Sequence, residues 1–148
     1  MSKLILFVCT GNTCRSPMAE YYFNYKSHGG LRAVSRGIYA ETGGFMAENA
    51  KQVLLAGNIV TDTGGVAHRP MRIDEEIMRE AVLIYGMTEN HANILCASFP
   101  AYADKIYAMP ENIGDPYGSG PEVYAECFER IRSAVDIIIK DLQRNGHV

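Results

Sequence analysis

Apolar runs alternate along this chain with segments whose apolar residues recur every three or four positions. The runs are typical of buried strands, and the spaced segments are typical of helices with one apolar face. Four strands are predicted, at residues 4–8, 33–35, 82–85 and 105–107. Five helices are predicted, at residues 17–28, 45–56, 74–79, 88–99 and from 121 onward.

Hydroxyl, carboxyl and proline residues mark where these helices begin. Ser16 is predicted to be the N-cap of the first helix, with Pro17 at its first position. Asp74 and Thr88 are predicted to cap the third and fourth helices. The last helix has one apolar stripe that should face the core, made by Tyr124, Cys127, Ile131, Val135, Ile138 and Leu142.

The alternation of strands and helices continues without a linker or an internal repeat. It predicts an α/β fold, a single-domain open doubly wound sheet of four parallel strands flanked by about five helices, over residues 1–148. In such sheets, ligands bind beyond the carboxyl ends of the strands, where the strand order reverses. The loop after the first strand is therefore the expected site.

That loop combines a thiol, a glycine and a guanidinium in the sequence Cys9-Thr10-Gly11-Asn12-Thr13-Cys14-Arg15-Ser16. It leads into a helix N-terminus, where free N–H groups and the helix dipole attract an anion. Gly11 and Asn12 tolerate the left-handed angles that turn successive N–H groups inward as an anion nest. The loop is therefore predicted to bind a phosphoryl group.

Cys9 and Arg15 add reactivity to this loop. Arg15 and the helix N-terminus favour the nucleophilic thiolate over the thiol, and Ser16 can donate a hydrogen bond to the sulfur. Arg15 can also hold two phosphoryl oxygens at once, which a lysine cannot. The alternative is a buried, inert Cys9 and a solvated Arg15, because this spacing alone recurs by chance.

A second candidate element precedes the last helix, with the sequence Gly114-Asp115-Pro116-Tyr117-Gly118. Attack of a thiolate on phosphorus gives the leaving atom no proton, so a separate general acid is needed. Asp115 is predicted to be that acid and then to activate the hydrolytic water, with Tyr117 as an aromatic wall of the substrate pocket. The alternative is an ordinary turn, since Asp-Pro commonly occurs in turns.

Two further residues are predicted to support the first loop. Ser35 follows the second strand beside that loop, and His68 lies in an irregular segment. Either side chain can hydrogen-bond Asn12 and hold the nest open. The remaining histidines are expected at the surface: His28, His91 and His147.

The spacing of the four cysteines limits the roles that they can have. Cys9, Cys14, Cys96 and Cys127 are not spaced as a zinc site. No cofactor is predicted. Cys14 either forms a reversible disulfide with Cys9 or only packs beneath the loop. Cys96 and Cys127 are expected to be small core residues.

A net charge of −3 without a basic stripe gives no support for binding to nucleic acid or to a membrane surface. No apolar segment approaches the length of about 18 residues that a membrane span needs. The expectation is a cytoplasmic monomer.

These residues closely resemble the low-molecular-weight protein tyrosine phosphatase family over nearly the whole chain. The first strand, the loop through Glu20, and Asp115-Pro116-Tyr117 carry the resemblance. It implies Cys9 as nucleophile, Arg15 as phosphate clamp and Asp115 as general acid, without a metal. It also implies Asn12, Ser16, Ser35 and His68 as loop supports, and Cys14 as the partner in a protective disulfide. Arg36 departs from the alanine that relatives often carry there.

Thr13 bears on the substrate. Tyrosine phosphatases of the family usually have an apolar residue here, which packs on a phenyl ring, whereas a smaller hydroxyl residue suits a polar guanidinium better. The family's bacterial protein-arginine phosphatases are similar to this chain, with the same Thr-Gly-Asn-Thr sequence. The resemblance thus favours phosphoarginine over phosphotyrosine, with neutral variation at Thr13 as the alternative.

Two other activities fit less well. A thiol-dependent arsenate reductase would need cysteines just after the third strand, where the sequence reads Tyr85-Gly86-Met87-Thr88. An inactive phosphate-binding module would gain nothing from a reactive thiol. The expected function is therefore that of a metal-free phosphatase that acts on phosphorylated proteins and forms and hydrolyses a phosphocysteine.

Overall fold

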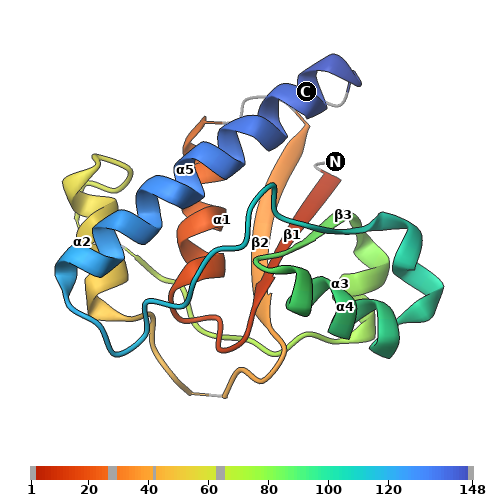
Figure 1. Cartoon of the computed structure of the whole chain (residues 1–148), viewed down its shortest axis with the longest axis horizontal. Coiled ribbons are helices and arrows are strands. Elements are labelled where there is room, and N and C mark those ends of the chain that lie inside the picture. Colours follow the sequence, from red (N-terminus) through yellow and green to blue (C-terminus); the bar gives the residue numbers. More distant parts are fainter. Residues whose placement is uncertain (1–2, 27–29, 42, 63–65, 147–148) are drawn as a thin grey trace.

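The computed structural model describes residues 3–26, 30–41, 43–62 and 66–146. A parallel four-stranded sheet in the order β2-β1-β3-β4 lies at the centre of the molecule (Figure 1). Its strands are β1 (Lys3–Cys9), β2 (Leu31–Gly37), β3 (Ala81–Gly86) and β4 (Ile106–Ala108). The helices are α1 (Arg15–Lys26), α2 (Glu48–Ala56), α3 (Glu75–Glu80), α4 (Glu89–Ser98), the 3-10 helix η2 (Pro100–Lys105) and α5 (Pro121–Arg144). The predicted fold class is confirmed.

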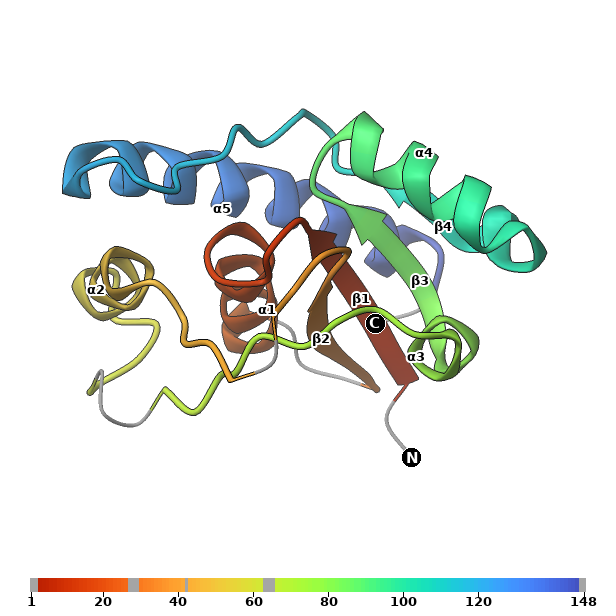
Figure 2. The ribbon, with the colours of Figure 1, turned by 90° about the horizontal axis from the view of Figure 1, so that it is seen from below.

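Helices cover both faces of the sheet (Figure 2). Ile5 and Phe7 of β1 belong to a core cluster with α1, α2 and α5, whereas Leu6 and Val8 pack with residues of α3 and α4. Successive strand residues point to opposite faces, so a strand covered on both sides needs apolar residues throughout. This double burial explains why β1 is a continuous apolar run rather than an alternating one.

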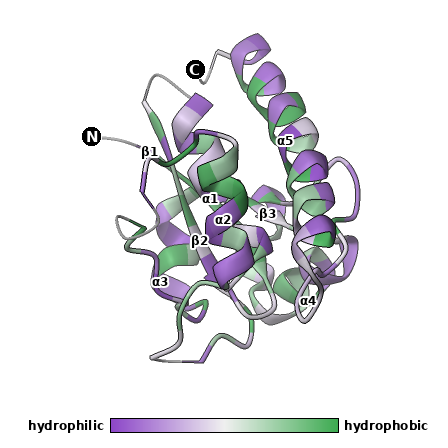
Figure 3. Cartoon of the chain, turned by 90° about the vertical axis from the view of Figure 1, so that its left-hand side faces the viewer, coloured by the Kyte–Doolittle hydropathy of each residue, from purple (hydrophilic) through white to green (hydrophobic). Residues whose placement is uncertain are grey.

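Helix α5 packs as its periodicity predicts. All six residues of the apolar stripe are buried, while Figure 3 shows that the helix also carries a hydrophilic side. The strand order reverses beside β1, which pairs with β2 on one side and β3 on the other. The carboxyl end of β1, at Cys9, thus opens at the switch point of the sheet.

Two predicted helix starts are wrong, and both deviations involve contacts with the loop after β1. Helix α1 begins at Arg15, so Ser16 is a helical residue rather than the N-cap. Its hydroxyl oxygen lies 2.9 Å from Cys9 Sγ and accepts from Asn12 Nδ2 at 2.9 Å instead. Helix α2 begins at Glu48 rather than 45, because the backbone N–H of Ala47 donates to Thr13 O at 2.9 Å. The predicted caps Asp74 and Thr88 are confirmed.

Candidate active site

The loop from Cys9 to Ser16 wraps around the sulfur of Cys9. The backbone N–H of Asn12 donates to Cys9 Sγ at 3.3 Å, and the Ser16 hydroxyl lies 2.9 Å from the same atom. Asn12, with φ of 58°, is the loop residue that adopts the left-handed conformation, whereas Gly11 does not. The Asn12 N–H directed at the sulfur and the N-terminus of α1 together favour negative charge at this position.

Asn12 is fully buried and holds the loop in place through both of its polar side-chain atoms. Its Nδ2 group donates to Ser16 Oγ at 2.9 Å and to Ser35 Oγ at 3.0 Å. Its Oδ1 atom accepts from the backbone N–H of Met71 at 2.9 Å, and its carbonyl oxygen lies 2.8 Å from His68 Nε2. Ser35 and His68, the two residues predicted to hydrogen-bond Asn12, are therefore both in hydrogen-bond contact with it.

Glu20 completes this network, and the sequence did not assign it a role. The Ser35 hydroxyl donates to Glu20 Oε1 at 2.6 Å, and His68 Nδ1 lies 3.9 Å from the same oxygen. Burial raises the pKa of Glu20 and lowers the pKa of His68. The available signal was the spacing of Ser16 and Glu20, since residues four positions apart lie on one face of a helix.

His91 was expected at the surface, and that prediction is wrong. The residue is 5% exposed, with Nε2 lying 2.9 Å from Thr10 Oγ1 and Nδ1 lying 3.0 Å from Thr88 Oγ1. Burial, and then the charge of Arg15, lowers the pKa of His91 to about 4. Helix α4 comes this close because Gly86 has no side chain, since a Cβ there would lie 2.6 Å from Ala92 N. His28 and His147 lie outside the described residues.

Arg15 and Asp115 meet across the pocket. The Arg15 side chain is buried and donates through Nη1 to the carbonyl oxygen of Ile113 at 2.9 Å. Its Nη2 atom lies 3.7 Å from Asp115 Oδ2, while the Asp115 side chain is 55% exposed. The backbone N–H of Tyr117 donates to Asp115 Oδ1 at 3.0 Å. The structure thus brings the predicted nucleophile, clamp and acid to one cavity.

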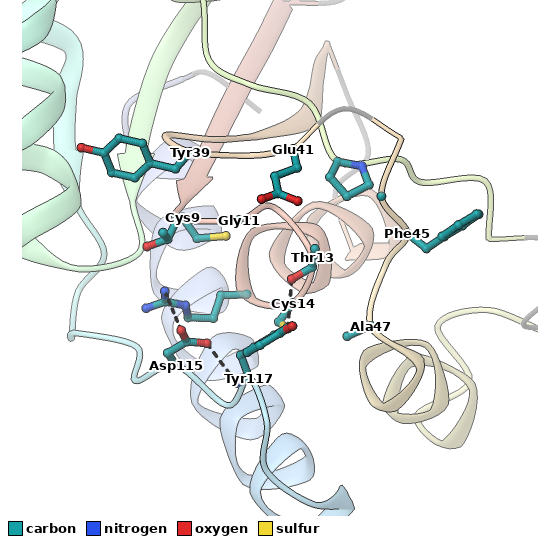
Figure 4. Close-up of a pocket in the computed structure, with 14 residues that line it drawn as sticks. Cys9, Gly11, Thr13, Cys14, Tyr39, Glu41, Phe45, Ala47, Asp115 and Tyr117 are labelled. Atoms are coloured by element: carbon teal, nitrogen blue, oxygen red, sulfur yellow. Dashed lines mark hydrogen bonds and ion pairs between the residues drawn. The ribbon is translucent and has the colours of Figure 1, made fainter.

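The cavity has a volume of about 430 Å³ (Figure 4). Its floor is the loop after β1, and Asp115 and Tyr117 close one side. The opposite wall comes from the segment after β2 together with Pro70, and its lining residues are Tyr39, Glu41, Gly44, Phe45, Ala47 and Pro70. Three aromatic side chains of the described residues line the cavity: Tyr39, Phe45 and Tyr117. Only Tyr117 was predicted. Tyr39 and Phe45 could have been found from their place after the carboxyl end of β2.

The four cysteines are free thiols. Cys14 is buried beneath the loop, with Sγ 3.2 Å from Tyr124 Oη and 3.4 Å from Thr13 Oγ1, and burial raises its pKa. Cys127 is a buried core residue, as predicted, whereas Cys96 is only partly buried and packs against the core on the other face of the sheet. Among the described residues, no group of three or more His, Cys, Asp or Glu side chains could hold a metal ion. None of the helices in the described part of the chain is long and apolar enough to cross a membrane.

A thiol, a guanidinium and a carboxyl group around one anion-binding loop at a sheet switch point define a cysteine-dependent phosphatase. The chain belongs to the family described as low molecular weight phosphotyrosine protein phosphatase, whose model matches residues 4–148. It is a hydrolase that acts on phosphorylated proteins through a cysteine.

The relatives include enzymes named for both substrates. A protein-arginine-phosphatase of Geobacillus stearothermophilus is 33% identical, over 97% of this chain and 98% of the relative. The solved low molecular weight protein tyrosine phosphatase from T. tengcongensis has a TM-score of 0.88 and 37% identity, covering 95% of this chain and 100% of that one. A solved mutant of the YwlE arginine phosphatase with a phosphorylated active-site serine has a TM-score of 0.85 and 29% identity, covering 95% of each chain.

Proposed function

We propose that this protein is a protein-arginine phosphatase that works through a phosphocysteine on Cys9. The observation that carries this proposal is Thr13 in the floor of the substrate cavity. Its hydroxyl oxygen lies 3.4 Å from Cys14 Sγ, so a polar side chain occupies the place where an aliphatic one would pack on a phenyl ring. The protein-arginine-phosphatase of Geobacillus stearothermophilus, 33% identical, supports the same assignment.

The reaction has two steps. The Cys9 thiolate attacks phosphorus, so an S–P bond forms as the P–N bond to the guanidino group breaks, and Asp115 gives its proton to the departing nitrogen. Water then attacks the phosphocysteine with Asp115 as the base, and the S–P bond breaks to release phosphate and the thiolate. Arg15 and the loop N–H groups bind the equatorial oxygens, where charge develops in both steps.

The other residues of the loop have supporting roles in this proposal. Thr10, Gly11, Cys14 and the rest of the loop supply the backbone N–H groups of the phosphate site. Asn12, Ser35 and His68 keep the nest open, because their hydrogen bonds fix the buried side chain and carbonyl of Asn12. Ser16 stabilises the sulfur as the leaving group in the second step. These contacts should therefore matter for every substrate.

Substrate preference is tested by kcat/KM on matched peptides that carry phosphoarginine or phosphotyrosine. The wild type should prefer phosphoarginine, and Thr13→Ile should reverse that preference. Thr61→Ile is the matched control, because Thr61 is exposed and does not line the cavity. A preference for phosphotyrosine that Thr13→Ile leaves unchanged would contradict the proposal.

Phosphotyrosine is the second candidate substrate. The side chains of Tyr39, Phe45 and Tyr117, which form the rim of the cavity, favour it. Tyr39, Phe45 and Tyr117 line the cavity and are largely exposed, so they are available to stack on a phenyl ring. The tyrosine phosphatase from T. tengcongensis, 37% identical, points the same way. The comparison of the two peptides decides between these substrates.

The proposal also covers the regulation of the enzyme, its compartment and its oligomeric state. We propose that oxidation joins Cys9 to Cys14 in a reversible disulfide that protects the nucleophile, and that the enzyme works as a cytoplasmic monomer. Four free thiols suit a reducing compartment, and one chain supplies every residue of the site. After peroxide treatment, the wild type should regain activity with dithiothreitol, whereas Cys14→Ser should lose activity irreversibly. Equal recovery of both proteins would contradict the protective role.

A further inference from the structure

The cavity wall after β2 is fastened to the phosphate loop at both ends. The backbone N–H groups of Ile38 and Tyr39 donate to the carbonyl oxygens of Cys9 and Thr10, each at 2.9 Å. At the other end, Ala47 is bound to Thr13 as described above. These bonds fix the ends of the wall relative to the reacting sulfur.

Glu41 lies on this wall and lines the cavity. Figure 4 shows its carboxylate directed toward the loop, from the side of the cavity opposite Asp115. The charged side chains that line the cavity are one cation, Arg15, and two carboxylates, Glu41 and Asp115. Arg15 is paired with Asp115, whereas Glu41 makes no hydrogen bond or ion pair with any residue that the structure describes.

An extra carboxylate is unfavourable beside a site that binds a phosphoryl dianion, because like charges repel each other. The balance changes when the substrate brings its own cation. Phosphotyrosine has only a neutral ring beyond its phosphoryl group. Phosphoarginine has a guanidino group whose free N–H groups can donate to a carboxylate, and that group leaves as a guanidinium cation.

We propose that Glu41 is a specificity-determining residue that recognises the guanidino group of phosphoarginine, and this inference rests on the proposed function. Asp115 protonates the departing nitrogen from one side of the cavity. Glu41 accepts hydrogen bonds from the remaining N–H groups on the other side. Its attraction grows as the guanidinium charge develops, so it favours breakage of the P–N bond over breakage of an ester to a phenol.

The test is kcat/KM of wild type and Glu41→Gln on the two matched peptides. The glutamine keeps the size of the side chain and removes its charge. Activity on phosphoarginine should fall about tenfold, which corresponds to one charge-assisted hydrogen bond at a partly exposed site. Activity on phosphotyrosine should stay the same or rise, because a repulsive charge has gone.

The control is Glu76→Gln, the same change at an exposed residue of α3 that does not line the cavity. It should leave both activities unchanged, and thermal unfolding should show that both variants fold like the wild type. Equal losses of Glu41→Gln on the two peptides, or no loss on either, would overturn the role of Glu41 while the proposed function stands. A wild type that does not hydrolyse phosphoarginine would overturn both.

Discussion

The floor and the rim of the cavity are built in opposite ways. Cys9, Asn12, Arg15 and Ser16 of the floor are buried, and each side chain is hydrogen-bonded, either within the loop or to a neighbouring segment. The rim consists of exposed side chains, with Tyr117 at 72% exposure. A preorganised floor suits the phosphoryl group that every substrate shares. An open rim suits the part that differs. Substitutions of these four buried floor residues should therefore affect all substrates, whereas substitutions at the rim and at Thr13 should discriminate between them.

The largest effect is expected at the floor, with Cys9→Ser. A serine hydroxyl is a far poorer nucleophile than a thiolate, so kcat should fall by at least about 10⁴-fold on both peptides. Phosphate binding by calorimetry should survive, because Arg15 and the loop N–H groups remain. Turnover close to that of the wild type would show that Cys9 is not the nucleophile.

Asp115→Asn should have the next largest effect and should depend on the leaving group. Without a proton donor, kcat on phosphoarginine should fall about 10²- to 10⁴-fold. The loss should be smaller on an aryl phosphate whose phenolate leaves easily, because that group needs little protonation. Equal losses on both substrates would contradict a role as general acid, and phosphate affinity serves as the control for binding.

His91 tests the floor through stability. Because the pKa of His91 is lowered from 6.5 to about 4, the unfolded chain binds a proton between these pH values that the folded chain does not. The free energy of unfolding should therefore fall as the pH drops through this window. Arg15 and Asp115 are the charged groups that act on this ring.

His91→Gln should remove that part of the pH dependence. Urea unfolding at pH 7 should show a stability loss of about 1–3 kcal/mol, since the Thr10 and Thr88 hydroxyls lose their present partner. At pH 5 the difference between the two proteins should shrink. Two stability curves that run parallel from pH 7 to pH 5 would contradict a neutral, buried ring.

The smallest effect is expected at the rim, with Tyr117→Ala. Stacking on an exposed aromatic ring contributes little, so kcat/KM on phosphotyrosine should fall about two- to tenfold and that on phosphoarginine should fall less. Tyr107→Ala is the matched control, since Tyr107 is exposed on β4 and does not line the cavity. A loss as large as that of Asp115→Asn would place Tyr117 in the chemistry rather than at the rim.

The floor was predictable from sequence because it is local. A buried strand, a glycine loop and a helix start lie within one stretch of chain. The topology of the sheet then places the loop that carries Asp115 beside them. Glu20, Glu41 and His91 were missed because their places depend on packing between distant segments. His91 reaches Thr10 only because Gly86 lets α4 approach the sheet closely.

The wrong helix starts have the same origin. Ser16 has the residue type of an N-cap, but its hydroxyl is hydrogen-bonded to the Cys9 sulfur and to Asn12. These contacts override the local preference of serine for the N-cap position. The helix predicted from 45 begins later because Ala47 is bound to the phosphate loop. Predictions of helix starts from local residue types therefore fail where the same residues make the contacts that build the cavity.

The proposed reaction requires a phosphocysteine on Cys9 that forms from phosphoarginine. The most direct measurement is acid quench of wild-type enzyme mixed with each peptide, followed by mass spectrometry of the peptide that contains Cys9. One added phosphoryl group is expected on Cys9, and it should form faster from phosphoarginine than from phosphotyrosine. An absence of the adduct, or faster formation from phosphotyrosine, would contradict the proposed function.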